Sequence, residues 1–218
     1  MKQEKDEKRK YSRYFEFLEW FDLELRTLKN ARIEESVIHW ETGDGGKGSC
    51  LLPIILRQEN WTSLEDLRRT LDNPFRYGII LMQAGRASIA VAEEDEILYS
   101  KQIQKYMVRK SQGKSQLSYL NEKGKSRLGS RIRLRQSQEF FEDIDAKLKE
   151  LCREHDLKYL FLSCTPKLKG HWHQATGGAA VDRKDSRWRR IPFMLHSPSQ
   201  DETQRMHRLL CRVSWQIC

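Results

Sequence analysis

Gln116 is a side chain that could position a nucleophile without acting as a base. A glutamine amide does not take up a proton near neutral pH, but it can accept a hydrogen bond from a water or hydroxyl while donating another. Upstream stand Arg109, whose planar guanidinium matches a phosphate, and Tyr106, whose ring could stack on a base. This combination suits cleavage of a bond in or beside a sugar-phosphate chain, and we predict these three residues to be catalytic.

Small and basic residues surround the three. Gly113 and Ser115 would let the backbone approach a sugar-phosphate closely, and a backbone N–H there could donate to a developing oxyanion. We predict that the substrate is bound by these two residues together with nearby cations, namely Lys105, Lys110, Lys114, Arg131 and Arg133. We expect neither a metal ion nor a cofactor at this site.

The positive charge of the chain is concentrated in the same segment. Residues 101–135 carry eleven basic side chains and one acidic side chain, so they account for the entire formal net charge of +9. Within them, residues 111–134 offer too few apolar side chains to form part of a core, and we expect a long flexible loop that a polyanion would order. Nucleic acid is therefore the expected partner.

The elements that must hold this loop have the pattern of an α/β fold. Before the loop, β-favouring runs at 77–83, 86–92, 97–99 and 103–109 predict an antiparallel meander. After it, Ser137 is expected to cap a helix that carries Phe140, Ile144 and Leu148 on one face, followed by a strand at 159–162. A strand at 191–195 and a helix begun by a Ser199/Glu202 capping box, with Val213 inside it, complete this part.

The first third of the chain reads as an accessory layer. Residues 13–30 have the spacing of an amphipathic helix, and 36–40 and 51–56 read as strands around a glycine-rich turn at 43–49. A Thr62/Glu65 capping box predicts a short helix that has ended by Pro74. We therefore divide the chain into an N-terminal layer, 1–74, and a core, 75–218. At 218 residues and 38% hydrophobic composition, we expect the two to form one compact unit.

Composition excludes several classes of protein. No run approaches the about eighteen apolar residues that a membrane span requires, and residues 1–10 are charge-rich where a signal peptide would be apolar. The five cysteines are scattered and never occur as C-x-x-C, which argues against a disulfide frame and a zinc ribbon. These features predict a soluble, cytoplasmic protein that has no membrane partner and is a monomer.

The run Lys105-Tyr106-x-Val108-Arg109-Lys110-x-Gln112-Gly113-x-Ser115-Gln116, the helix after a Ser/Gly/Arg-rich loop, and Ile191-Pro192-Phe193 carry a family resemblance. Over residues 75–213 the chain resembles the release-factor-like domain of the ankyrin-repeat and zinc-finger peptidyl-tRNA hydrolases, which is related to the middle domain of eukaryotic and archaeal release factors. The resemblance implies a ribonuclease-H-like mixed sheet with packed helices and a basic catalytic loop. Where release factors use a Gly-Gly-Gln tip, this chain has Gly113-Lys114-Ser115-Gln116. It lacks the ankyrin repeats and the zinc finger, so it looks like a minimal, bacterial-type member.

The same resemblance implies cleavage of peptidyl-tRNA, at or near the 3′ CCA end, on stalled large ribosomal subunits during ribosome quality control. The matching tyrosine, arginine and glutamine are functional in that family. Ester hydrolysis and phosphodiester cleavage both stay open, although a guanidinium fork fits a phosphorane better than an ester carbonyl. Two other functions also stay open: non-catalytic binding of tRNA or the large subunit through the same loop, and a metal-dependent nuclease.

Four further features have less specific readings. The basic residues of 183–190 around Trp188 could form a second RNA-contacting patch or an exposed loop. His171 and His173 lack a placed third ligand, so we do not expect a metal site there. Residues 43–49 lack the order of a phosphate-binding loop and are expected to form a turn. The carboxylates of 139–145 are expected to be solvated on the outer face of their helix.

Overall fold

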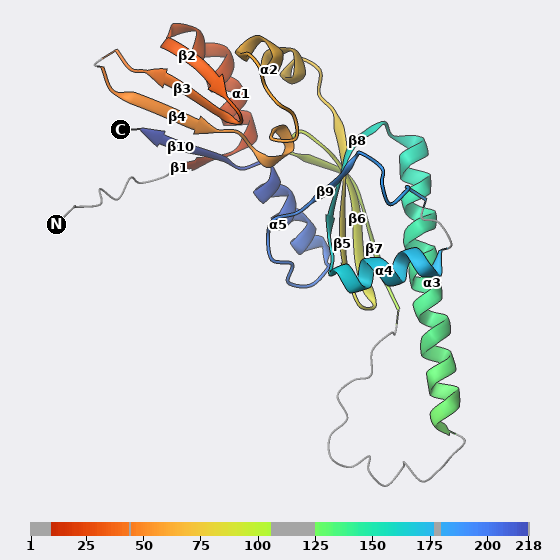
Figure 1. Cartoon of the computed structure of the whole chain (residues 1–218). Coiled ribbons are helices and arrows are strands. Elements are labelled where there is room, and N and C mark those ends of the chain that lie inside the picture. Colours follow the sequence, from red (N-terminus) through yellow and green to blue (C-terminus); the bar gives the residue numbers. More distant parts are fainter. Residues whose placement is uncertain (1–9, 44, 106–124, 177–179, 218) are drawn as a thin grey trace, which may run out of the picture. The chain divides into compact units, whose positions relative to one another are not determined.

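The computed structural model describes residues 10–43, 45–105, 125–176 and 180–217, and in these ranges the chain forms two compact units (Figure 1). The first unit contains the chain up to Phe75, residues 93–96 and the C-terminus from Gln204, and the second contains 76–92 and 97–203. The prediction of a single compact unit was wrong, because the N-terminal layer has its own sheet and its own aromatic core.

The first unit is built on a five-stranded sheet with the order β1-β10-β4-β3-β2. Its strands are β1 (Lys10–Ser12), β2 (Lys29–Glu34), β3 (Val37–Glu41), β4 (Lys47–Leu51) and β10 (Val213–Ile217), and neighbouring strands are antiparallel. The C-terminal strand β10 thus lies between β1 and β4, with Trp215 opposite both Lys10 and Cys50. A strand from the far end of the chain completes this sheet.

Helix α1 (Tyr14–Leu23) supplies the aromatic side chains of this core. Phe17 and Phe21 are buried, and the Trp20 ring lies 5.0 Å from that of Trp40 and 4.7 Å from that of Trp215. The predicted helix over 13–30 is shorter than expected, because a 3-10 turn, η1 (Leu25–Thr27), follows α1 and residues 29–34 are the strand β2.

Two other predictions in this unit need correction. The expected strand at 51–56 contains only the last residue of β4, and 54–56 form the 3-10 turn η2 (Ile54–Leu56). Helix α2 (Leu64–Leu71) is capped by Ser63, whose hydroxyl accepts a hydrogen bond from Asp66 N at 3.1 Å, and Thr62 instead bonds the Asp66 carboxylate. The turn that joins β3 to β4 lies where the glycine-rich turn was predicted.

The second unit contains a mixed five-stranded sheet with the order β7-β6-β5-β8-β9. The strands are β5 (Arg76–Gln83), β6 (Arg86–Glu93), β7 (Glu96–Gln104), β8 (Leu157–Ser163) and β9 (Trp188–Arg190). The tight turns after β5 and β6 make these hairpins, so β7 runs in the direction of β5, and β8 and β9 are parallel to β5. The α/β class is confirmed. The two runs predicted at 97–99 and 103–109 form one strand as far as Gln104.

Helix α3 (Lys125–Glu154) packs its C-terminal half on this sheet. Its buried side chains join those of β5, β6 and β8 in one core, including Phe140, Ile144, Leu148 and Leu151. The prediction that Ser137 begins the helix was wrong, because α3 starts twelve residues earlier and passes beyond the sheet (Figure 1). Residues 125–134, which we predicted as loop, are part of this helix.

The rest of the unit corrects the predicted C-terminal elements. Between the predicted strands at 159–162 and 191–195, where we predicted no helix, the chain forms α4 (Pro166–Ala175), which is capped by the Thr165 hydroxyl. The strand expected at 191–195 lies at Trp188–Arg190, and the Gln83 amide donates to the carbonyls of Leu195 and His196 at 3.4 and 2.6 Å. Helix α5 (Gln200–Leu210) ends before Val213, which begins β10.

One half of the predicted Ser199/Glu202 box is present, since Glu202 N donates to the Ser199 hydroxyl at 3.1 Å. The Glu202 carboxylate also accepts a hydrogen bond from His196 N at 2.8 Å. Among the described residues, no helix combines the length and the apolar character that a membrane crossing would require.

Candidate functional site

The carboxyl ends of four strands gather at one end of the second sheet. Strands β5, β7, β8 and β9 run in the same direction, so Gln83, Gln104, Ser163 and Arg190 terminate on the same side. In open α/β sheets, ligands bind outside the carboxyl ends of the strands. This end is also where the chain leaves β7 toward the segment that carries the predicted catalytic residues.

Lys105 is fixed at this point by its backbone and by its side chain. Its N–H donates to the carbonyl of Gly85 at 3.0 Å, in the turn between β5 and β6, where Gly85 has a φ of +82° that favours glycine. Its ammonium lies 3.1 Å from Asp143 Oδ2 and 3.9 Å from Glu139 Oε2 on α3. The last residue before the segment is therefore tied to both a turn and a helix.

The contacts of Lys105 bear on what the sequence predicted for Lys105 and for the carboxylates of 139–145. Lys105 was predicted to bind substrate, which stays a prediction, and the structure shows its ammonium held by two helical carboxylates. The carboxylates of 139–145 were expected to be solvated, and all four are at least partly exposed. Each also has a partner, since Glu139 and Asp143 face Lys105, Glu142 accepts from the Gln138 amide at 3.0 Å, and Asp145 accepts from Ala180 N at 2.5 Å.

Most of the predicted site residues lie outside the described residues. These are Tyr106, Arg109, Lys110, Gly113, Lys114, Ser115 and Gln116. The backbones of Arg131 and Arg133 belong to α3, in the part that passes beyond the sheet. The structure therefore describes the residues on either side of the segment that carries the predicted catalytic residues, namely Lys105 before it and Lys125, at the beginning of α3, after it.

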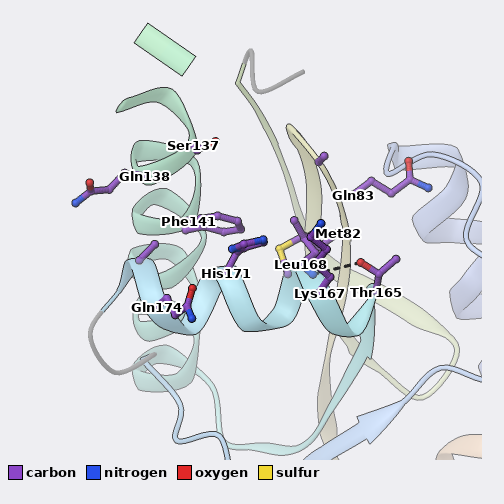
Figure 2. Close-up of a pocket in the computed structure, with 12 residues that line it drawn as sticks. Met82, Gln83, Ser137, Gln138, Phe141, Thr165, Lys167, Leu168, His171 and Gln174 are labelled. Carbon is purple, nitrogen blue, oxygen red and sulfur yellow. Dashed lines mark hydrogen bonds between the residues drawn. The ribbon is translucent and has the colours of Figure 1, made fainter. Parts of the chain in front are cut away.

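An open pocket of about 720 Å³ lies at the same end of the sheet (Figure 2). Its apolar walls include Met82 at the end of β5, Phe141 on α3 and Leu168 on α4. The remaining lining residues are Gln83, Ala84, Ser137, Gln138, Thr165, Lys167, His171, Gln174 and Ala175, so no carboxylate is among the described residues of the wall. A pocket of this size and mixed lining is typical of small-ligand sites.

Several polar groups of this wall already have partners, and others do not. The Gln83 amide donates to two carbonyls, the Gln138 amide donates to Glu142 at 3.0 Å, and Thr165 caps α4. Lys167, His171 and Gln174 are exposed, and within the described ranges their side chains make no hydrogen bond or ion pair. In Figure 2, His171 points from α4 toward Phe141.

Sequence reasoning missed this pocket because it missed α4. The signal was present in Thr165-Pro166, since threonine is a good N-cap and proline is favoured at the first helical position. The spacing of Leu168, Trp172 and Ala175 then places one apolar face toward the core.

The two histidines beside Trp172 have different surroundings. His171 lines the pocket, whereas His173 is 7% exposed and its ring stacks on that of Trp172 at 5.4 Å and 14°. Burial lowers the pKa of His173, and the charges of Arg183 and Lys169 lower it further. In the part of the chain that the structure describes, no three His, Cys, Asp or Glu side chains are grouped so as to hold a metal ion.

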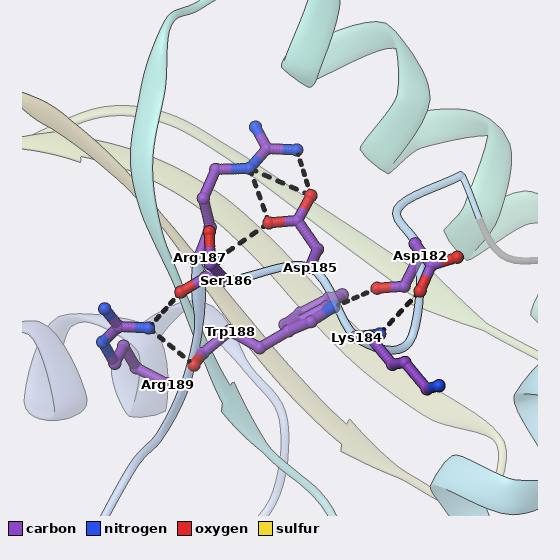
Figure 3. Close-up of polar contacts among 7 residues, drawn as sticks. All are labelled: Asp182, Lys184, Asp185, Ser186, Arg187, Trp188 and Arg189. Carbon is purple, nitrogen blue, oxygen red and sulfur yellow. Dashed lines mark hydrogen bonds and ion pairs between the residues drawn. The ribbon is translucent and has the colours of Figure 1, made fainter.

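The second basic patch predicted around Trp188 is partly neutralised (Figure 3). Arg187 forms a two-pronged ion pair with Asp185, with Nη2–Oδ2 at 2.8 Å and Nε–Oδ1 at 3.0 Å, which lowers the pKa of Asp185. The indole N–H of Trp188 donates to the carbonyl of Asp182 at 2.8 Å. This loop is therefore ordered by its own contacts.

One family model matches more than half of the chain. The family model described as bVLRF1, Bacteroidetes VLRF1 release factor, matches residues 77–217, from the start of β5 to the end of β10. Among solved structures, a chain titled "Vms1 mitochondrial localization core" is similar at 14% identity and a TM-score of 0.46, covering 91% of this chain and 81% of that chain. No curated protein matches.

Proposed function

Because the chain belongs to the Bacteroidetes VLRF1 release factor family, we propose that it cleaves peptidyl-tRNA, at or near the 3′ CCA end, on stalled large ribosomal subunits. The observation that carries this proposal is the family match over 77–217, a range that includes Tyr106, Arg109 and Gln116. Release-factor-like proteins act on ribosomes, so the wider setting is ribosome quality control. The partners in this proposal are tRNA and the large ribosomal subunit.

Each residue has one role in the proposed reaction. The ribose 2′-hydroxyl next to the scissile phosphate attacks phosphorus, and Gln116 holds that hydroxyl in line. Arg109 offsets the extra negative charge of the phosphorane, and Tyr106 stacks on a neighbouring base. The 2′-hydroxyl gives up its proton to water as its oxygen bonds to phosphorus. The bond from phosphorus to the 5′-oxygen then breaks, the departing oxygen takes up a proton from water, and the shortened tRNA ends in a 2′,3′-cyclic phosphate.

The contacts of Lys105 support the proposal that the segment with the predicted catalytic residues is held at its start. Its backbone bond to Gly85 and its ion pair with Asp143 give the segment a fixed starting point four residues before Arg109. Catalysis by orientation depends on such restraint, since a misplacement of about 1 Å can cost about a hundredfold in rate. The basic side chains that follow, Lys110 and Lys114, would hold the phosphates around the scissile bond.

The open pocket fits the same substrate. It lies beside Ala84, the residue before Gly85, and its apolar walls and unengaged amide and imidazole groups suit a nucleobase. Single-stranded RNA is recognised in this way, by stacking and by hydrogen bonds to base edges. We therefore place a nucleotide of the acceptor end in this pocket.

The test is cleavage of peptidyl-tRNA bound to isolated large subunits. Gln116→Ala should lower the rate by about a hundredfold or more, as when one positioned catalytic donor is lost. The matched control is Gln204→Ala, an exposed glutamine on α5, which should keep the wild-type rate. A Gln116→Ala chain that cleaves like the control would eliminate this mechanism.

The competing function is non-catalytic binding of tRNA or the large subunit. The net charge of +10 on residues 101–135 favours it as much as it favours catalysis. Binding alone would be supported over cleavage if the wild-type chain binds large subunits in a salt-dependent manner and leaves the peptidyl-tRNA intact.

A further inference from the structure

Strand β9 is the outermost strand of the second sheet and carries an excess of positive charge. It pairs with β8 on one side, with Trp188 opposite Leu160 and Arg190 opposite Leu162, and no described strand pairs with its outer side. Five basic residues lie on β9, on the loop that leads into it or on α4, and we call them the β9 edge cations: Lys169, Arg183, Lys184, Arg189 and Arg190.

Aromatic rings hold two of the β9 edge cations in place. The ammonium of Lys169 lies 5.5 Å from the centroid of the Trp188 ring, and the guanidinium carbon of Arg189 lies 4.9 Å from that of Tyr159. Arg189 also donates to the carbonyl of Trp188 at 3.0 Å (Figure 3). Side chains that are already ordered lose less conformational entropy when they bind a ligand.

The other three are exposed and are not neutralised by carboxylates. Arg183, Lys184 and Arg190 form no ion pair within the described ranges. The two acidic residues of this loop already have partners, since Asp185 pairs with Arg187 and Asp182 accepts from Lys184 N at 2.7 Å. Asp182 keeps its negative charge, because its bond to Lys184 N is to a neutral donor, and the cations around β9 outnumber it.

Edge strands often carry charges simply to prevent pairing with other chains. One or two charges of either sign are enough for that purpose, whereas five cations supported by two aromatic rings exceed it. Arginine and lysine held in this way match the phosphates of a nucleic acid backbone, which are contacted without regard to base sequence. We propose that the β9 edge cations bind the phosphate backbone of ribosomal RNA of the large subunit.

The position of this edge separates it from the proposed catalytic segment. Strands β7 and β9 are the opposite edges of the sheet, and four strand spacings place them about 19 Å apart. Lys105 follows β7, so the segment with the predicted catalytic residues begins at the edge opposite β9, whereas α4, which carries Lys169, also lines the open pocket in which we place a nucleotide. We assign the β9 edge to ribosomal RNA and the β7 edge to the tRNA, an assignment that rests on the proposed function.

The experiment measures binding without cleavage. Labelled full-length chain carrying Gln116→Ala is titrated with isolated large subunits at salt concentrations from about 50 to 200 mM. The test variant adds Lys184→Gln and Arg190→Gln, and the matched control adds Lys149→Gln and Arg153→Gln, one exposed lysine and one exposed arginine on α3. The charge-preserving pair Lys184→Arg and Arg190→Lys serves as rescue.

The test variant should bind subunits about tenfold more weakly, and the slope of log affinity against log salt should fall by about two, one for each lost phosphate contact. The control and the rescue variant should retain the parental affinity and slope. With Gln116 restored, the test variant should still cleave free peptidyl-tRNA at the wild-type rate.

Equal binding by the test variant and the control would overturn the proposal. Equal losses in binding to subunits and to free deacylated tRNA would overturn the assignment to ribosomal RNA. If the wild-type chain cleaves no peptidyl-tRNA but the test variant alone loses affinity for subunits, the proposed function fails and the β9 edge assignment stands.

Discussion

Replacing His173 with phenylalanine should make the protein less sensitive to acid. His173 is 7% exposed, and within the described part of the chain neither ring nitrogen has a hydrogen-bond partner. Burial lowers the pKa of this ring in the folded protein, so below the unfolded value of about 6.5 the unfolded chain binds a proton that the folded chain does not. Stability is then lost as the pH falls from about 6.5 toward the folded pKa.

The size of the effect follows from the same contacts. One such group changes the free energy of unfolding by at most about 1.4 kcal/mol per pH unit. Phenylalanine keeps the flat stacking on Trp172 and removes two unsatisfied nitrogens, whose burial costs about 1–3 kcal/mol. His173→Phe should therefore equal or exceed the wild-type stability at neutral pH.

The assay is chemical unfolding at several pH values between about 7.5 and 5.5, a window that spans the unfolded histidine pKa. The wild type should lose stability across this window, and His207, whose pKa is also lowered by burial, contributes with the same sign. His173→Phe should show the shallower slope. A variant with the wild-type pH dependence, or one that unfolds at neutral pH, would refute the reasoning.

Three further predictions concern packing, the anchor and the pocket. Gly48→Ala should destabilise the protein by about 1–3 kcal/mol in chemical unfolding, since the added methyl group would overlap the Trp40 indole; wild-type stability would contradict this packing. A double-mutant cycle of Lys105→Met and Asp143→Asn should give a coupling below about 1 kcal/mol, because both side chains are partly exposed; a larger coupling would argue against a surface pair. Gln174→Ala should raise KM for free peptidyl-tRNA with kcat little changed, and an unchanged KM would remove the nucleotide from the pocket.

The second sheet was largely predictable, because its buried strands are continuous apolar runs. Residues 79–82 and 159–162 are buried in the fold and could belong only to a core. The strand β9 was displaced by three residues or more from the prediction, because its residues are polar and its place is set by pairing with β8. Edge strands show little apolar alternation, so periodicity locates them poorly.

The strand order of the first sheet could not be predicted, since it depends on contacts between the two ends of the chain, although the strand expected at 36–40 is present as β3. Strand β10 pairs Trp215 with Lys10 and with Cys50, and local pattern contains no information about such partners. The start of α3 was missed for a different reason. Residues 125–134 lack an apolar face, and only their helix propensity indicated a helix.

For the candidate site too, the sequence predicted some features and not others. The catalytic residues came from residue chemistry and from the resemblance over 105–116, and they stay predictions. The ion pair of Lys105 with Asp143 joins residues that are far apart in the sequence, and so does the pocket between β5, α3 and α4. The spacing of residues along the sequence does not reveal such contacts.

Sizing the RNA that wild-type chain releases from peptidyl-tRNA on isolated large subunits tests the central claim most directly. We predict a tRNA that is shortened at its 3′ end and carries a 2′,3′-cyclic phosphate. With free peptidyl-tRNA as substrate, the same product should form in the presence of EDTA. Arg109→Lys should badly impair the reaction, because a point charge cannot replace the guanidinium fork. Intact tRNA with a free CCA end would overturn phosphodiester cleavage and leave ester hydrolysis. Peptidyl-tRNA that stays uncleaved while the protein is bound would contradict the enzymatic function itself.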